Sequence, residues 1–451
     1  MARAKFQSTL KAPAANADLA SAVADAEAHY VAANPKSKAR AEAAMRSMPG
    51  GNTRTVLHYG PFPLALTGGK GCEVTDIDGH GYADFLGEYT AGLYGHSNTK
   101  LIAAIKQAVD DGVVLGGPNR YEAELAELMC QRFPSVELVR FCNSGTEGNL
   151  FAMSAARMHT GRNAIMVFNG AYHGGVFYFG QHKPPTNAPF PWVIARYNDT
   201  EGTQKLIEKH AKELAAIVIE PMMGGGGGIS ALPDFLMALR EATLKHGIVL
   251  IFDEVMTSRL SSGGLQKKTG ITPDLTAFGK YLGGGMTFGA FGGRKDIMDR
   301  FNPYRRDAVG HAGTFNNNVL SMAAGVVGLR DIYTPEAATR LNATGDTLIA
   351  DLNGIFVRHG APMQVLGQGS IMAVHFQTGT IERPEDTWLE GAAAQHREAL
   401  MQLFHLDLLR MGQYMARRGF ISLSLPIGAQ HLTAFKGAVE EFLSVRKSVL
   451  R

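Results

Sequence analysis

Cysteine and long apolar runs are both scarce in this sequence. The chain of 451 residues contains three cysteines, Cys72, Cys130 and Cys142, whose spacing matches neither a disulfide framework nor a zinc site. The first thirty residues lack the apolar centre of a secretory signal, and no run reaches the roughly 20 apolar residues of a transmembrane helix. We therefore expect a cytoplasmic protein, in a reducing compartment, with no membrane partner and no metal.

An excess of either charge is also absent. The 44 lysines and arginines almost balance the 41 aspartates and glutamates, which leaves a formal net charge of +3, and no run of basic residues stands out. Proteins that bind nucleic acid concentrate positive charge on one surface, so we expect no nucleic-acid partner. Apolar residues make up 45% of the chain, enough for a sizeable core, and the 53 glycines gather at a few points.

Three regions of the chain differ in their sequence pattern. Residues 1–85 begin with an alanine-rich arm of about 20 residues, which we expect to be mobile, and continue with short apolar runs between turns such as Asp78-Gly79. Residues 86–330 alternate apolar strands with helices, and residues 331–451 open with a helix start at Thr334-Pro335. We expect an N-terminal segment that packs with the small domain, a large domain, and a smaller α+β domain.

Short runs rich in valine and isoleucine mark the strands of the central region. They are Leu138–Cys142, Ala164–Phe168, Ala216–Ile219 and Ile248–Phe252. Continuous apolar runs of this length are typical of parallel strands buried on both faces, and helical segments lie between them. The pattern predicts an α/β fold with a mostly parallel central sheet. In such sheets, ligands bind beyond the carboxyl ends of the strands.

Polar residues follow the first three of these strands. After the first come Ser144, Gly145 and Thr146 at a helix start, where free N–H groups, hydroxyls and the helix dipole can bind a phosphate. A simple helix N-cap explains the same residues equally well. The second strand leads to Tyr172, which can stack on a flat cofactor, and the third ends at Glu220, shortly before a run of five glycines. Each of these last two signals is weak alone.

An aspartate and a lysine give stronger signals. Asp253 closes the fourth apolar run, where a carboxylate is costly to bury unless it meets a cation or a donor. A protonated pyridine nitrogen is such a partner, although an aspartate that caps a turn also fits. Lys280 closes a fifth apolar run among glycines, and partial desolvation there would lower its pKa and make the amine nucleophilic towards an aldehyde. The combination indicates a cofactor site.

With these motifs in this order, the chain resembles the class III aminotransferases of fold type I, which use pyridoxal 5′-phosphate (PLP). The resemblance runs from near Arg40 to Leu443. It implies that Lys280 carries PLP as a Schiff base, and that Thr314 reaches the phosphate bound in the neighbouring subunit of a homodimer with shared active sites. The cofactor-binding residues that it implies are Ser144, Gly145, Thr146, Tyr172, Glu220, Asp253, Val255, Lys280 and Thr314.

One position departs from the family. Gly148 stands where alanine is usual in these enzymes. Glycine costs up to about 1 kcal/mol in a helix interior and less in a first turn, so the departure does not change the expected fold.

Two branches of the family share the N-terminal motifs, Pro49–Arg54 and Tyr59–Pro63. These are the β-amino-acid transaminases that act on β-phenylalanine-like substrates and the glutamate-1-semialdehyde aminomutases. Segments Glu88–Gly92, Thr314–Asn318 and Arg417–Phe420 resemble the first branch. This implies a transaminase that moves the amino group of a β-amino acid to a 2-oxo acid such as 2-oxoglutarate or pyruvate. The implied catalytic residues are Lys280 and Asp253, and the implied substrate-binding residues are Arg54, Glu88, Tyr89 and Arg418.

Other interpretations of these residues remain open. Arg54 and Arg418 can be ordinary surface charges. A semialdehyde aminomutase would move an amine within one molecule and need no external acceptor. A PLP-binding regulator without turnover is disfavoured by the retained Lys280 and by the absence of a basic DNA-binding segment.

Overall fold

The computed structural model describes residues 18–450, so almost all of the alanine-rich arm lies outside the described residues. Its centre is a seven-stranded sheet. In spatial order the strands are β4 (Leu138–Cys142), β12 (Gly289–Gly293), β11 (Leu275–Gly279), β10 (Val249–Asp253), β7 (Leu214–Ile219), β5 (Ala164–Phe168) and β6 (Trp192–Ala195). Only β12 runs antiparallel to its neighbours in this sheet. The predicted mostly parallel sheet is therefore confirmed.

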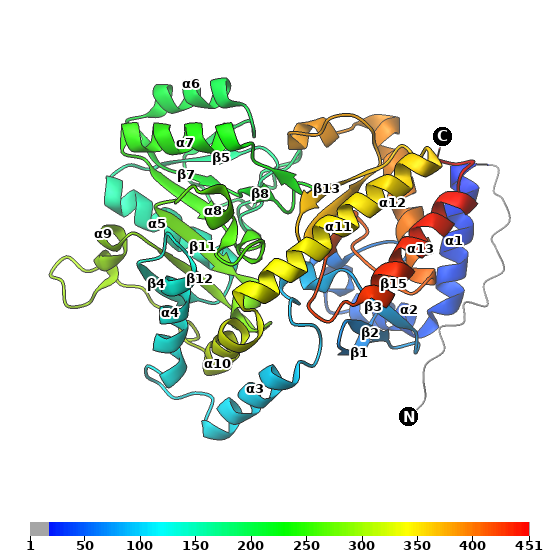
Figure 1. Ribbon diagram of the computed structural model, residues 1–451, viewed down its shortest axis with the longest axis horizontal. Helices are drawn as coiled ribbons and strands as arrows, with labels where there is room; N and C mark the ends of the chain where they lie inside the picture. The colour runs from blue at the N-terminus through cyan, green and yellow to red at the C-terminus, as the bar shows by residue number, and fades with distance from the viewer. Residues whose placement is uncertain (1–17, 451) are drawn as a thin grey trace.

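Helices enclose this sheet and form one lobe of the molecule (Figure 1). They are α3 (Thr99–Asp111), α4 (Arg120–Arg132), α5 (Gly145–Thr160), α6 (Thr200–His210), α7 (Pro233–His246), α8 (Gly264–Thr269), α9 (Lys295–Met298) and α10 (Val319–Val327). Because every residue of β5, β7, β10 and β11 is buried, these strands read as continuous apolar runs in the sequence.

Helix α5 packs closely on the sheet. It begins at Ser144, whose Oγ accepts a hydrogen bond from the Glu147 N–H at 3.2 Å, and ends at Gly161, which has a φ of +68°. A Cβ added at Gly148 would lie 2.6 Å from the Ala290 carbonyl oxygen of β12. The glycine that departs from the family therefore stands where α5 and β12 approach most closely.

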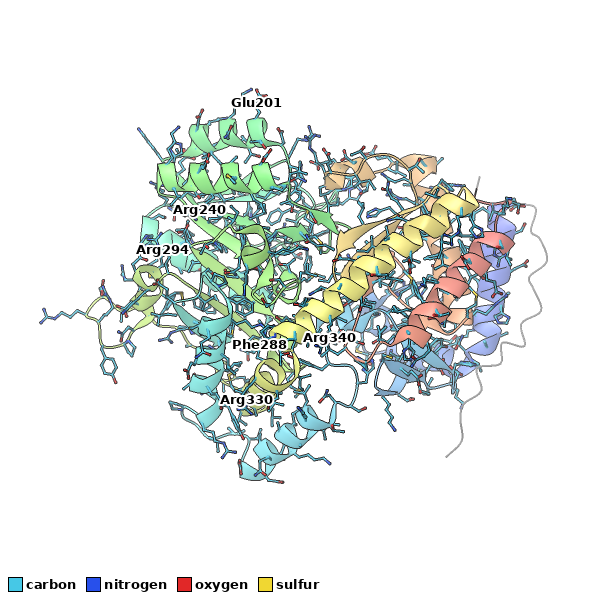
Figure 2. The ribbon with its side chains drawn as sticks, viewed as in Figure 1. Glu201, Arg240, Phe288, Arg294, Arg330 and Arg340 are labelled. Atoms are coloured by element: carbon cyan, nitrogen blue, oxygen red, sulfur yellow. The ribbon has the colours of Figure 1, made fainter. Side chains whose placement is uncertain are left out.

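Ion pairs and a hydrogen bond link neighbouring strands at the edge of the sheet opposite the predicted site. Asp274, just before β11, accepts from Arg240 of α7 and from Arg294, which follows β12, at 2.9 Å each (Figure 2). Its Oδ2 also accepts the Leu250 N–H of β10 at 2.8 Å. These contacts fix the amino ends of β10 and β11, so the polar residues at their carboxyl ends project from a rigid base.

The C-terminal part of the chain forms a second lobe. An antiparallel sheet contains β13 (Gln364–Gln368), β14 (Ile371–His375) and β16 (Phe420–Ser422), with α11 (Pro335–His359), α12 (Gly391–Arg410) and α13 (Ala429–Val445) beside it. Helix α11 is capped by Thr334, as predicted, and runs diagonally between the two lobes (Figure 1). Strand β16 ends at Ser422, and beyond it the Leu425 N–H donates to Leu93 O.

The N-terminal segment joins this second lobe. It contains α1 (Leu19–Ala33), α2 (Pro35–Ala44), β1 (Leu66–Lys70), β2 (Glu73–Asp76) and β3 (Gly81–Asp84). The predicted turn at Asp78-Gly79 connects β2 to β3. Strand β15 (Gln413–Tyr414) pairs in parallel with β3, and α1 packs against α12. These contacts join residues 18–85 to the second lobe, and the domain boundaries at residues 85 and 330 remain predictions.

Candidate active site

Five strand ends meet at one edge of the large sheet. Strands β4, β5, β7, β10 and β11 all run in the same direction, because β12 is antiparallel to both β4 and β11. Phe252 pairs with Ile219 and Asp253 with Ala277, so Asp253 lies beside both Glu220 and the end of β11. The topology therefore brings the predicted phosphate turn, ring-stacking segment, aspartate and lysine to one edge.

Lys280 begins a 3-10 turn at the end of β11. Its φ of +57° is unusual for a residue with a side chain, and such conformations are concentrated at functional sites. Burial lowers the pKa of Lys280 to about 8, against the opposing attraction of the Asp253 carboxylate. The neutral, nucleophilic amine is therefore populated near neutral pH.

Asp253 is buried at the centre of a hydrogen-bond network. Its Oδ2 lies 2.8 Å from both His173 Nδ1 and Asn149 Nδ2, and its Oδ1 accepts the Val255 N–H at 3.0 Å. Because a carboxylate only accepts, His173 Nδ1 carries the proton. The role of Asn149 in this network was not predicted from the sequence. The signal available was a single asparagine on the buried, otherwise apolar face of α5.

The start of α5 has a side-chain cap and free backbone donors. The Ser144 hydroxyl caps the helix, while the first-turn N–H groups have no partner inside the helix. A Cβ added at Gly145 would lie 2.7 Å from two methyl carbons of Val255, and one added at Gly174 would lie 2.3 Å from Thr146 Oγ1. The glycines thus let the phosphate turn approach Val255 and the segment that contains Tyr172.

Glu220 organises the backbone around the site. Its two carboxylate oxygens accept the N–H groups of Tyr172, at 2.9 Å, and of Gly224, at 3.0 Å. Burial raises the pKa of Glu220 to about 7, and nearby His173 acts in the opposite direction. Glu220 therefore holds the first glycine of the five-glycine run beside Tyr172, whose side chain is about half exposed and accessible for stacking.

The predicted substrate-binding residues meet above this edge. Arg54 forms an ion pair with Glu88 and lies 6.0 Å from the centre of the Tyr89 ring. Arg418 lies 5.2 Å from the same ring, which also stacks on Phe420 at 5.5 Å. Both arginines contribute to lowering the Lys280 pKa. Residues far apart in the chain, from the N-terminal segment to the second lobe, therefore surround one site.

Thr314 is placed differently from the other predicted residues. It is exposed, as is Phe315 beside it. Its loop is linked to the phosphate turn through Asn316, whose side-chain oxygen accepts from Asn143 Nδ2 at 3.0 Å. Sequence analysis did not assign this contact.

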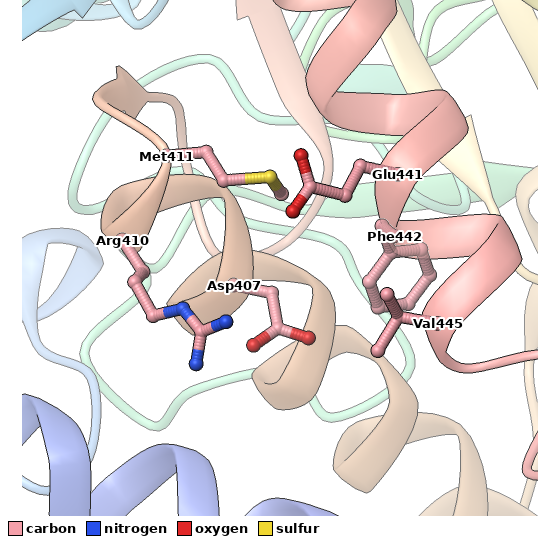
Figure 3. Close-up of a pocket in the computed structure, with 6 residues that line it drawn as sticks. All are labelled: Asp407, Arg410, Met411, Glu441, Phe442 and Val445. Atoms are coloured by element: carbon pink, nitrogen blue, oxygen red, sulfur yellow. The ribbon is translucent and has the colours of Figure 1, made fainter. Parts of the chain in front are cut away.

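A pocket lies in the second lobe, between α12 and α13 (Figure 3). It is lined by Asp407, Arg410, Met411, Glu441, Phe442 and Val445 from the ends of α12 and α13. Its buried Asp407 is engaged by Arg446, at 2.7 Å and 3.1 Å. Within residues 18–450, no cluster of three or more histidine, cysteine or acidic side chains is arranged for a metal. None of the helices in that range has the length and apolarity needed to cross a bilayer.

The donor set fits PLP. A lysine with a lowered pKa suits its aldehyde, a buried carboxylate suits its protonated ring nitrogen, and a helix N-terminus suits its phosphate. Fold and site together define a PLP-dependent enzyme of fold type I. The chain belongs to the class-III aminotransferases, whose family model matches residues 57–405. The predictions of family, fold class, enzyme class and cofactor are confirmed.

Individual proteins similar to this chain support the same family. The β-phenylalanine transaminase of Variovorax paradoxus is 47% identical over 429 residues, which cover 95% of this chain and 97% of that protein. The crystal structure of a β-phenylalanine aminotransferase from the same organism superposes with a TM-score of 0.93 at 46% identity, covering 96% of this chain and 99% of the other. A glutamate-1-semialdehyde 2,1-aminomutase of Desulforudis audaxviator is 35% identical over 403 residues, which cover 85% of this chain and 91% of that protein.

Proposed function

We propose that this aminotransferase moves the amino group of a β-phenylalanine-like β-amino acid to a 2-oxo acid such as 2-oxoglutarate or pyruvate. The observation that carries this proposal is the pair of arginines, Arg54 and Arg418, on the same tyrosine ring beside Lys280. The 47% identity to a β-phenylalanine transaminase supports it.

Each residue at the sheet edge has a role in this reaction. PLP, when bound, supplies an electron sink for the electrons of a broken C–H bond. Lys280 would hold the cofactor through its Nζ and, once that amine is free, would accept on it the proton from the amine-bearing carbon of the donor. Asp253, oriented by His173 and Asn149, keeps the ring nitrogen protonated. The first turn of α5 binds the phosphate.

Two cations are needed because the two substrates differ in shape. The carboxylate of a β-amino acid lies one carbon further from the reacting carbon than that of a 2-oxo acid. One fixed guanidinium cannot give good bidentate geometry to both. Arg54 would hold the donor carboxylate. Arg418, which donates to Gly225 O across 3.4 Å, near the limit for a hydrogen bond, would pair with the acceptor and move aside for an aromatic donor.

Single-turnover measurement of each half-reaction tests this division. Arg418→Ala should slow the 2-oxo acid half-reaction about ten- to a hundredfold and leave the β-amino acid half-reaction much less affected. Arg54→Ala should mainly damage the β-amino acid half-reaction. Arg417→Ala is the matched control, because the neighbouring Arg417 is already paired with Glu398 at 2.5 Å. Equal losses in both half-reactions for Arg418→Ala would contradict the proposal.

Acceptor dependence tests the reaction itself. A transaminase converts its donor catalytically only when a 2-oxo acid is present, whereas an aminomutase needs no acceptor. Sustained turnover of glutamate 1-semialdehyde without acceptor, together with no turnover of β-amino acids, would replace the proposed function by aminomutase activity.

The exposed Thr314 supports an assembly with shared sites. We propose that it binds the phosphate held by a second copy of this chain, which requires at least a homodimer. A fully active monomer in sedimentation would refute this. The three free thiols support the proposed location in a reducing compartment, the cytoplasm.

A further inference from the structure

Arg259 is the largest side chain that is completely buried in the described residues, with no exposed surface. A buried cation is costly unless its donors are satisfied. Its Nε donates to Ser370 Oγ at 3.1 Å. Its Nη1 donates to Ser422 Oγ at 3.1 Å and to Thr90 O at 3.3 Å, and Nη2 donates to Leu423 O. All these partners are neutral oxygens, and they come from three separate parts of the chain, at residues 90, 370 and 422–423.

One of these parts is the turn that presents the substrate-binding pair. Its four residues, Gly87 to Thr90, have φ values of +53°, +47°, +50° and +81°. Residues with side chains avoid this region, so a run of three there must be held by its surroundings. Ser422 closes the turn from the other side: a Cβ at Gly87 would lie 3.2 Å from Ser422 Oγ. Arg259 therefore contacts the turn directly at Thr90 and indirectly through Ser422.

We propose that Arg259 is a positioning residue for substrate binding. Its guanidinium holds the left-handed turn that places Glu88 and Tyr89 between Arg54 and Arg418. The proposal rests on the proposed function in so far as these four residues bind the substrate. A planar guanidinium can bridge several oxygens in fixed directions. Arg259 therefore links the edge of the large sheet, where Lys280 lies, to β16, the strand that follows Arg418.

The two serines offer a matched pair of variants. Ser422 and Ser370 are both fully buried, and each accepts one hydrogen bond from Arg259 at 3.1 Å. Of the two, only Ser422 also lies close to the turn, where a Cβ added at Gly87 would be 3.2 Å from its Oγ. Ser422→Ala and Ser370→Ala each remove one bond to the same cation, so we expect similar losses of thermal stability. A difference in substrate KM between the two variants would then reflect a change in the turn at residues 87–90.

Two readouts on the holoenzyme decide the proposal. In Ser422→Ala the KM for the amino donor should rise about tenfold with kcat changed less than about twofold, and Ser370→Ala should leave both near wild type. In the substrate-free holoenzyme, amide exchange over residues 86–92 should accelerate only in Ser422→Ala, because the Tyr89 and Gly92 N–H groups bond within the turn. If the alanine variant does not fold, Ser422→Cys is compared with Ser370→Cys in the same way.

Three results would overturn the positioning role. They are equal KM increases in both variants, no increase in either, and faster exchange in Ser422→Ala without a change in KM. Failure of the proposed function is distinct from these. If the wild-type enzyme turns over no β-amino acid, the proposed function fails, while the exchange pattern and the KM for the amine that it does use still decide the role of Arg259.

Discussion

Replacing Gly145 by alanine would test whether the phosphate turn depends on its close approach to Val255. The added Cβ would lie 2.7 Å from both Val255 methyl carbons, a separation that real Cβ atoms essentially never show. Val255 cannot easily retreat, because its N–H is bonded to Asp253 at 3.0 Å and its Cγ1 faces Gly279, where a Cβ would lie 3.1 Å away. The first turn of α5 must therefore move away from Val255.

The size of the effect follows from the cost of overpacking. One extra methyl in a tightly packed position costs about 1–3 kcal/mol. The apoenzyme can relieve this strain by displacing the turn, but PLP binding requires the turn in place. The Kd for PLP should therefore rise about five- to 150-fold. Equilibrium titration of the apoenzyme with PLP, followed by absorbance, measures this directly.

A double-mutant cycle identifies the cause. Val255→Ala removes the methyl groups that the new Cβ would meet, so Gly145→Ala in that background should weaken PLP binding much less than it does alone. Unchanged PLP affinity in Gly145→Ala, or strictly additive effects in the double variant, would refute the steric argument.

Three further predictions concern the catalytic pair. Lys280→Ala should lose both turnover and covalent attachment of PLP, and a borohydride-fixed cofactor in that variant would contradict its role. Asp253→Asn should still bind PLP but lose most of its kcat, because an amide does not stabilise the ring charge as a carboxylate does; near-wild-type kcat would argue against this. The rate at which apoenzyme takes up PLP should rise with pH and level off above about 8, because the neutral Lys280 amine is the reactive form. A rate that keeps rising about tenfold per pH unit up to about pH 10 would count against the lowered pKa.

The parallel strands could be predicted from sequence because burial on both faces leaves a continuous apolar run. The predicted Leu138–Cys142 and Ala164–Phe168 have the bounds of the observed β4 and β5. Strand β12 could not be predicted in this way. Its three glycines carry no apolar signal in the sequence. They are required by packing, since a Cβ at Gly289 would lie 2.1 Å from Ser144 O.

The catalytic centre was easier to predict than its supports. Lys280 and Asp253 follow strands in recognisable patterns, so their positions could be inferred. The contact of Asn149 with Asp253 and the bridge at Arg259 join residues more than a hundred positions apart, which no local pattern contains. The run of five glycines was a weak signal in the sequence. Added Cβ atoms there would meet Met256, Tyr172 and His375, which explains the glycines by close packing.

The pairing of β3 with β15 has a consequence for biosynthesis. The open edge of β3 receives its partner only when residues 413 and 414 have been made, about 330 residues later. At about 5–20 residues per second, the ribosome needs roughly 15 to 65 s to reach them. During that interval the nascent N-terminal hairpin presents unpaired N–H and C=O groups, which are a template for pairing with other chains. Chains that end before residue 413 would keep this edge open and should aggregate more readily than the complete chain.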